Sequence, residues 1–105
     1  MRHHRILSAH THMRQAELEY KRVYEYANRY LENSSHDRLS SSRNYAVFMG
    51  TELGRTCEGF LILEENFVRA SCDRQPPIDS LMLDVVMMSR ETLESWFPPY
   101  AHYQL

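Results

Sequence analysis

Apolar residues near the start of the chain recur at alternating spacings of three and four. The repeat runs from Ile6 to Tyr30, and no Gly or Pro interrupts it. This spacing puts its members on one side of an α-helix, so it predicts a long amphipathic helix over Met13–Glu32, capped by Ser8 or Thr11. We expect Asn33 to end this helix in a left-handed conformation. The expected buried seam is Ile6, Ala9, Met13, Ala16, Tyr20, Val23, Ala27 and Tyr30.

The middle of the chain is divided into short segments by turn-forming residues. Residues 34–42 include five serines and are predicted to form a loop. Three aromatic and β-branched segments, 45–49, 56–64 and 67–72, are typical of strands, with turns at 50–54 and 64–66. The middle of the chain therefore predicts a small antiparallel meander.

The last third of the chain is ambiguous. Residues 81–88 fit either a buried strand or part of a helix, and we favour a strand. A short helix is then expected from Arg90 to Trp96, with Ser89 as its N-cap. Two prolines stop this helix and leave 98–105 as a C-terminal tail.

Together these elements predict an α+β fold. A long N-terminal amphipathic helix would cover a small antiparallel β-sheet, and a short C-terminal helix would complete the core. The length of 105 residues fits a single domain over residues 1–105, with residues 1–8 frayed.

Composition excludes several classes of protein. The formal charge of −2 provides no overall attraction to phosphate backbones, which disfavours nucleic acid as the main partner. Apolar runs fall short of the ~20 residues of a membrane span, and the start lacks the apolar core of a signal peptide. We therefore expect a cytoplasmic protein with no membrane partner. Its cysteines, Cys57 and Cys72, are expected to be reduced thiols buried in the core.

No residue pattern indicates catalysis, a cofactor or a metal centre. The three glycines form neither a dinucleotide fingerprint nor a phosphate-binding loop. His10 and His12 lie about 200° apart on a helix and cannot chelate one ion together. We expect a protein that is not an enzyme and has no cofactor, although a small metal protein or enzyme using these histidines or a Cys/His pair remains an alternative.

Two groups of aromatic residues are candidates for contact with a partner. On the long helix, tyrosines alternate with arginines, a composition that protein interfaces favour. At the C-terminus, aromatic side chains flank two prolines, which reduce the entropy lost on docking. The candidate partner-binding residues are Arg22, Tyr24, Tyr26, Arg29, Trp96, Phe97, Tyr100 and Tyr103.

The sequence thus predicts a small protein-binding module, an adaptor or inhibitor of the kind that phages and mobile elements encode. The alternative is a nucleic-acid-binding regulator that uses the arginines of the long helix. A homodimer is also expected to be accessible, because the small residues Ala9, Ala16 and Ala27 would let two seams approach closely.

Overall fold

The protein is all-helical over the part of the chain that its structure covers. The computed structural model describes the backbone of residues 2–73 and 79–102, and the side chains of 11–73 and 79–102. These residues contain no β-strand, so the predicted α+β fold with an antiparallel sheet is wrong. They form four α-helices and one 3-10 helix: α1 (Arg2–Tyr30), α2 (His36–Thr51), α3 (Thr56–Asp73), α4 (Ser80–Trp96) and η1 (Pro98–His102).

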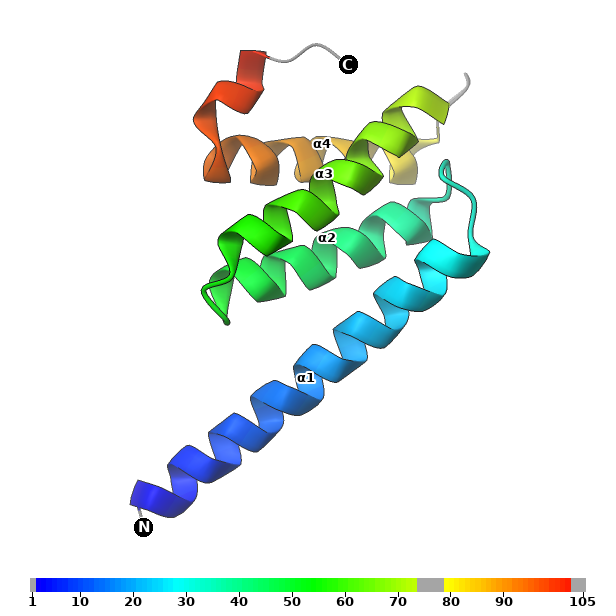
Figure 1. The fold of residues 1–105 in the computed structure, drawn as a ribbon. Coiled ribbons are helices and arrows are strands. Elements are labelled where there is room, and N and C mark those ends of the chain that lie inside the picture. Colours follow the sequence, from blue (N-terminus) through cyan, green and yellow to red (C-terminus); the bar gives the residue numbers. More distant parts are fainter. Residues whose placement is uncertain (1, 74–78, 103–105) are drawn as a thin grey trace.

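Helix α2 lies at the centre of the arrangement. It contacts α1, α3 and α4, whereas α1 contacts only α2 among the described helices. A helix of 29 residues is about 43 Å long and one of 16 residues about 24 Å, so α2 cannot run beside all of α1. Figure 1 shows α1 extending well beyond the other helices.

The core lies between α2, α3 and α4. Helices α2 and α3 approach closely at Gly59, where an added Cβ would lie 2.7 Å from the backbone oxygen of Ala46. Larger side chains fill the remaining space under α4 and η1. The buried cluster consists of Leu39, Ala46, Leu63, Phe67, Ala70, Met82, Val85, Val86, Leu93 and Tyr100.

The three segments predicted as strands lie inside α2 and α3. In α3, the buried residues Leu63, Phe67 and Ala70 follow the spacing i, i+4, i+7, which is helical and outweighs the strand propensity of the neighbouring side chains. Asn66, predicted to lie in a turn, is buried in the same helix, and its Nδ2 donates to the carbonyl of Ile62 at 3.2 Å.

The predicted serine-rich loop is also largely helical, because α2 begins at His36. Ser41 and Ser42 are buried within it. Their hydroxyls donate to the backbone carbonyls of Arg38 (2.9 Å) and Leu39 (2.7 Å), so burial leaves neither hydroxyl without a hydrogen bond. Because both hydroxyls bond to carbonyls of α2 itself, these small side chains can be buried where other helices pack against α2.

Residues 81–88 belong to α4, so the predicted strand is wrong. The N-cap is Asp79, whose carboxylate accepts a hydrogen bond from the backbone nitrogen of Met82 at 2.7 Å. Ser89, predicted as the N-cap, is instead buried in the middle of the helix, where its hydroxyl donates to the carbonyl of Val85 at 2.6 Å.

The C-terminal tail is partly structural. Helix α4 ends at Trp96, as the two following prolines predict. The chain then forms η1, and the ring of Tyr100 packs edge-on against Phe60 and Phe67 in the core. Tyr100, predicted to bind a partner, therefore lies in the core of this protein, with 3% of its surface exposed.

Helix α1 differs from its prediction at both ends and in its buried side. It begins at Arg2, upstream of the two predicted N-caps, and Asn33 is not left-handed. Ala27 is only 2% exposed, but Val23 is 59% exposed. A strict 3–4 repeat drifts around a helix of 3.6 residues per turn, and α2 covers only part of it. The side chains of Ile6 and Ala9 lie outside the described residues.

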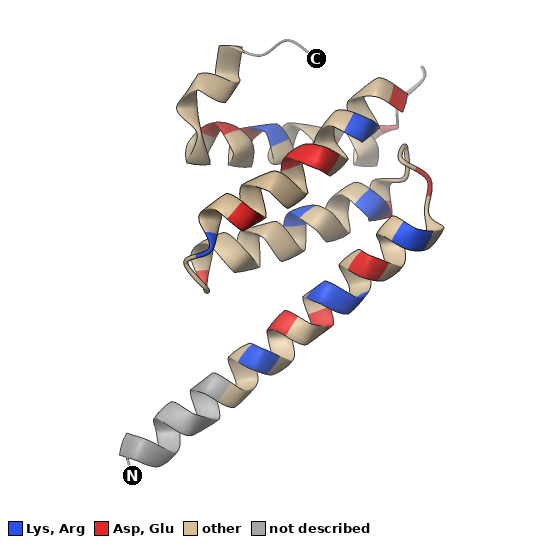
Figure 2. Ribbon diagram, in the orientation of Figure 1, with Lys and Arg blue, Asp and Glu red and all other residues tan. Residues whose placement is uncertain are grey.

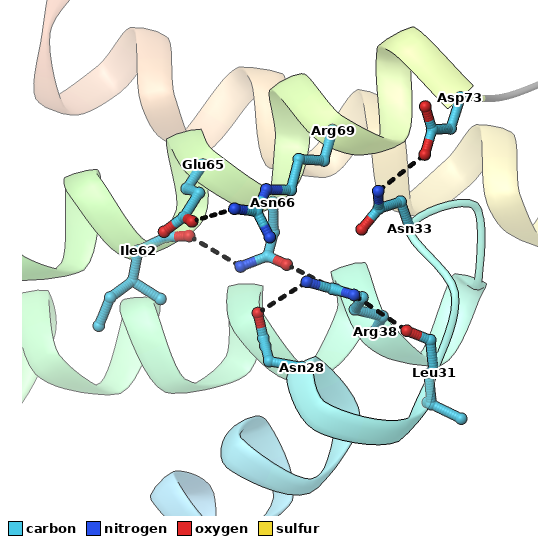
Figure 3. A network of polar contacts seen from close by, with 9 residues as sticks. All are labelled: Asn28, Leu31, Asn33, Arg38, Ile62, Glu65, Asn66, Arg69 and Asp73. Carbon is cyan, nitrogen blue, oxygen red and sulfur yellow. Dashed lines mark hydrogen bonds and ion pairs between the residues drawn. The ribbon is translucent and has the colours of Figure 1, made fainter.

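One buried cation joins three helices. The guanidinium of Arg38 donates from Nε to Asn66 Oδ1 (3.1 Å), from Nη1 to the Leu31 carbonyl (2.9 Å) and from Nη2 to Asn28 Oδ1 (3.3 Å). Figure 3 shows Arg38 between the end of α1 and α3. These acceptors are all neutral, and one of them is a backbone carbonyl beyond the last turn of α1.

Replacing Arg38 with alanine should lower the free energy of unfolding by about 2–4 kcal/mol, because one buried and two partly buried acceptors lose their donor. The matched control is Arg69→Ala. Arg69 forms an exposed ion pair with Glu65, so its loss should cost about 0–1 kcal/mol. Urea unfolding measures both, and equal costs would contradict the role given to Arg38.

A second pair of variants tests which side of α1 is buried. Ala27→Asp should destabilise the protein by several kcal/mol, because an unpaired carboxylate would be buried against α2. Measured in solution dilute enough for the single chain, Val23→Asp should change stability by about 0.5 kcal/mol or less, as is usual for an exposed site. Thermal melting followed by circular dichroism provides the comparison, and a larger loss for Val23→Asp would reverse the assignment.

Candidate functional site

An apolar hollow opens where the start of α3 meets the end of α4. Its volume is about 300 Å³. We call it the corner pocket. Its lining residues are Thr56, Cys57, Phe60, Leu61, Trp96 and Phe97.

Aromatic contacts hold the base of the corner pocket. Phe60 meets both Phe97 and Tyr100 edge-on, with ring centroids 5.8 Å apart in each case. Trp96 lies against Gly50, where an added Cβ would be 2.6 Å from its Cζ2 atom. The indole occupies the space that a side chain at position 50 would need. Gly50 on α2 therefore sets where Trp96 lies.

The rim of the corner pocket is exposed and apolar, and a carboxylate lies close to it on α3. Leu61 is 63% exposed, and Phe97 is also exposed. Glu64 lies one turn beyond Phe60 on the same side of α3, and it forms no ion pair with a described residue. Helices α3 and α4 together carry seven carboxylates and two arginines, which Figure 2 shows across both helices. Helix α4 also exposes Leu81, Leu83, Met87 and Met88.

A second exposed surface lies on α1, with arginines at its border. Tyr26 and Tyr30 are 61% and 64% exposed, and their ring centroids are 4.9 Å apart. The guanidinium of Arg29 lies 5.7 Å from the centroid of the Tyr30 ring, a cation–π contact. We call Glu19, Val23, Tyr26 and Tyr30, which follow a 4–3–4 spacing, the outer face of α1.

Tyr24 lies on a different side of α1 and supports it. Its ring is 5.3 Å from that of Tyr45 on α2. Burial, together with the nearby carboxylate of Glu65, raises the pKa of Tyr24, so its hydroxyl stays neutral at physiological pH. Tyr24 therefore packs α1 onto α2 and is not an exposed contact residue.

The predicted partner-binding residues thus separate into distinct places. Tyr26, Arg22 and Arg29 are exposed on α1, and Trp96 and Phe97 line the corner pocket. Tyr103 lies outside the described residues.

Sequence reasoning missed Cys57, Phe60 and Leu61 as pocket residues. Their spacing i, i+3, i+4 places them on one side of a helix. A helical assignment of residues 56–73 would therefore have grouped these three side chains.

Thiol, metal and polar sites elsewhere in the described residues have less support. Cys57 and Cys72 are unbonded and exposed, which corrects their assignment as core thiols. In the part of the chain described with side chains, no three metal-ligating residues gather in one place. A polar hollow beside Arg38 contains Asn33 and Asp73, which bind each other at 2.7 Å. The side chains of Arg38, Asn33 and Asp73 in this hollow are therefore already partnered.

Comparisons with known proteins do not narrow the function. No protein family model, curated protein or solved structure matches this chain. None of the described helices is both long and apolar enough to cross a bilayer.

The corner pocket provides its own optical reporter, because Trp96 is the single tryptophan of the chain. In a Cys72→Ser variant, N-ethylmaleimide on Cys57 should displace water beside the indole and shift its emission to shorter wavelength. In the matched Cys57→Ser variant, the adduct on Cys72 lies 15 residues, about 22 Å, along α3 and should leave the emission unchanged. Equal shifts in both variants would show that the corner pocket is not formed as described.

Proposed function

We propose that this protein is a protein-binding module, an adaptor or inhibitor, whose corner pocket receives a large apolar side chain of its partner. The supporting observation is an apolar pocket of about 300 Å³ with Leu61 and Phe97 exposed at its rim. Binding energy in protein interfaces concentrates where an aromatic or aliphatic anchor fills such a pocket. The aromatic contacts beneath it reduce the reorganisation that docking requires.

The acidic excess of the two helices that form the corner pocket favours a basic partner. Helices α3 and α4 have a clear excess of carboxylates, and that of Glu64 has no counter-ion among the described residues. A basic amphipathic helix would place lysines or arginines against these carboxylates while its apolar side chain enters the pocket. We propose such a helix as the bound segment.

The same charges count against the nucleic-acid alternative. A phosphate backbone drawn to the arginines of α1 would meet the carboxylates of α3 and α4 if it extended across the molecule. For the compartment, we propose the cytoplasm. Two exposed, unbonded thiols, Cys57 and Cys72, suit a reducing environment better than an oxidising one.

Blocking the corner pocket should remove the partner. Two immobilised forms of the protein are compared as baits in an extract of the cells that encode it. In the first bait, Cys72→Ser, benzylmaleimide on Cys57 blocks the corner pocket. In the second bait, Cys57→Ser, the same adduct is on Cys72, away from the pocket. We expect at least one protein to be retained about tenfold less by the first bait, because its anchor is excluded; this corresponds to about 1.4 kcal/mol. Quantitative mass spectrometry measures the retention.

Charge reversal provides an independent control. Glu64→Lys should release the same protein, whereas Glu32→Lys should not, because Glu32 is exposed beyond the end of α1 and beside the opposite end of α3. If no protein depends on the state of Cys57, the proposal fails. If nuclease treatment abolishes the retention, the nucleic-acid alternative is favoured instead.

A further inference from the structure

The outer face of α1 is an apolar surface that no described helix covers. Val23, Tyr26 and Tyr30 are each more than half exposed, and α1 contacts only α2. The homodimer predicted from sequence needed the seam through Ala27, which is buried against α2 and is not free. Any contact between copies must therefore use a different side of the helix.

The charges at this surface select both a partner and an orientation. Glu19 lies toward its N-terminal end, whereas Arg22 and Arg29 border it further along, and none of the three forms an ion pair with a described residue. Two parallel copies would place like charges together. Two antiparallel copies related by a two-fold axis at Val23 would place Glu19 level with Ala27 of the second copy, next to Tyr26 and about 3 Å along the helix from Arg29.

The shape of the molecule fits the same arrangement. A hollow of about 360 Å³ lies between α1 and α2 and is lined by Ala16, Glu19, Tyr20, Val23, Ser41 and Asn44. In the antiparallel pair, Tyr30 of the second copy falls opposite Ala16, the smallest residue on the α1 side of this hollow. A tyrosine ring contributes large contact area at low entropic cost.

We propose that the outer face of α1 binds the outer face of α1 in a second copy, antiparallel, with Tyr30 of each copy in the hollow beside Ala16 of the other. The contact is isologous and closes as a two-fold dimer. It uses none of the residues of the corner pocket, so it stands independently of the proposed function.

Sedimentation equilibrium of the full chain tests the dimer. We expect a mass of twice 12.5 kDa at micromolar concentration. Val23→Arg should raise the dissociation constant at least about tenfold, because the two arginines would meet at the two-fold axis. The matched control is Leu18→Arg, an exposed apolar site about 140° around the helix from Val23, which should have little effect.

Complementary charge reversals then test the orientation. Glu19→Arg and Arg29→Glu should each weaken self-association, since each brings like charges together across an antiparallel contact. Mixed in equal amounts, the two variants should form a heterodimer about as tight as the original, because both cross-pairs again have opposite charges. Circular dichroism melting confirms that every variant is folded.

Three results would overturn the proposal. The first is a monomer mass for the unchanged chain at all concentrations up to high micromolar. The second is a dimer that tolerates Val23→Arg. The third is a mixture of the two charge-reversal variants that associates no better than either one alone.

Discussion

The position of α1 depends on the buried guanidinium of Arg38. Burying a cation without a carboxylate is unfavourable, and here the compensation comes from three neutral oxygen acceptors on or beside two other helices. Such a group tolerates little displacement, because moving any helix leaves a charged donor without its acceptor. It fixes the C-terminal end of α1 to α2 and α3. The ring contact of Tyr20 with Phe48 and the ion pair of Glu17 with Arg55 attach α1 further along, and its N-terminal part extends past the bundle (Figure 1). The outer face of α1 is exposed because no described helix covers that side of it.

The near-zero net charge of the chain conceals an uneven distribution. Helix α1 carries six basic and three acidic residues, whereas α3 and α4 are strongly acidic (Figure 2). Each proposal uses a different part of this distribution: a basic partner at the corner pocket and a second copy at α1. A dimer through α1 would present two corner pockets, and two linked sites on one partner assembly would raise avidity without any new contact.

Sequence alone located the long helix, the proline stop after Trp96 and several of the exposed aromatic and arginine side chains. It failed on α3 because Phe60–Leu63 resembles a buried strand, and only the spacing of Leu63, Phe67 and Ala70 shows the helical side. It failed on Ser41 and Ser42 because their hydroxyls bond to their own helix, which composition does not reveal. The corner pocket was beyond prediction, since it depends on Gly50 leaving room for Trp96 from another helix.

Methionine placement gives the molecule an unequal response to oxidants. Met87 and Met88 are exposed on α4, whereas Met49 and Met82 are buried in the interior. Conversion of an exposed thioether to its sulfoxide replaces a flexible apolar group with a polar, chiral one. Mild oxidation would therefore make the surface of α4 more polar before it reached the core, and methionine sulfoxide reductases could reverse the change without the protein having to unfold.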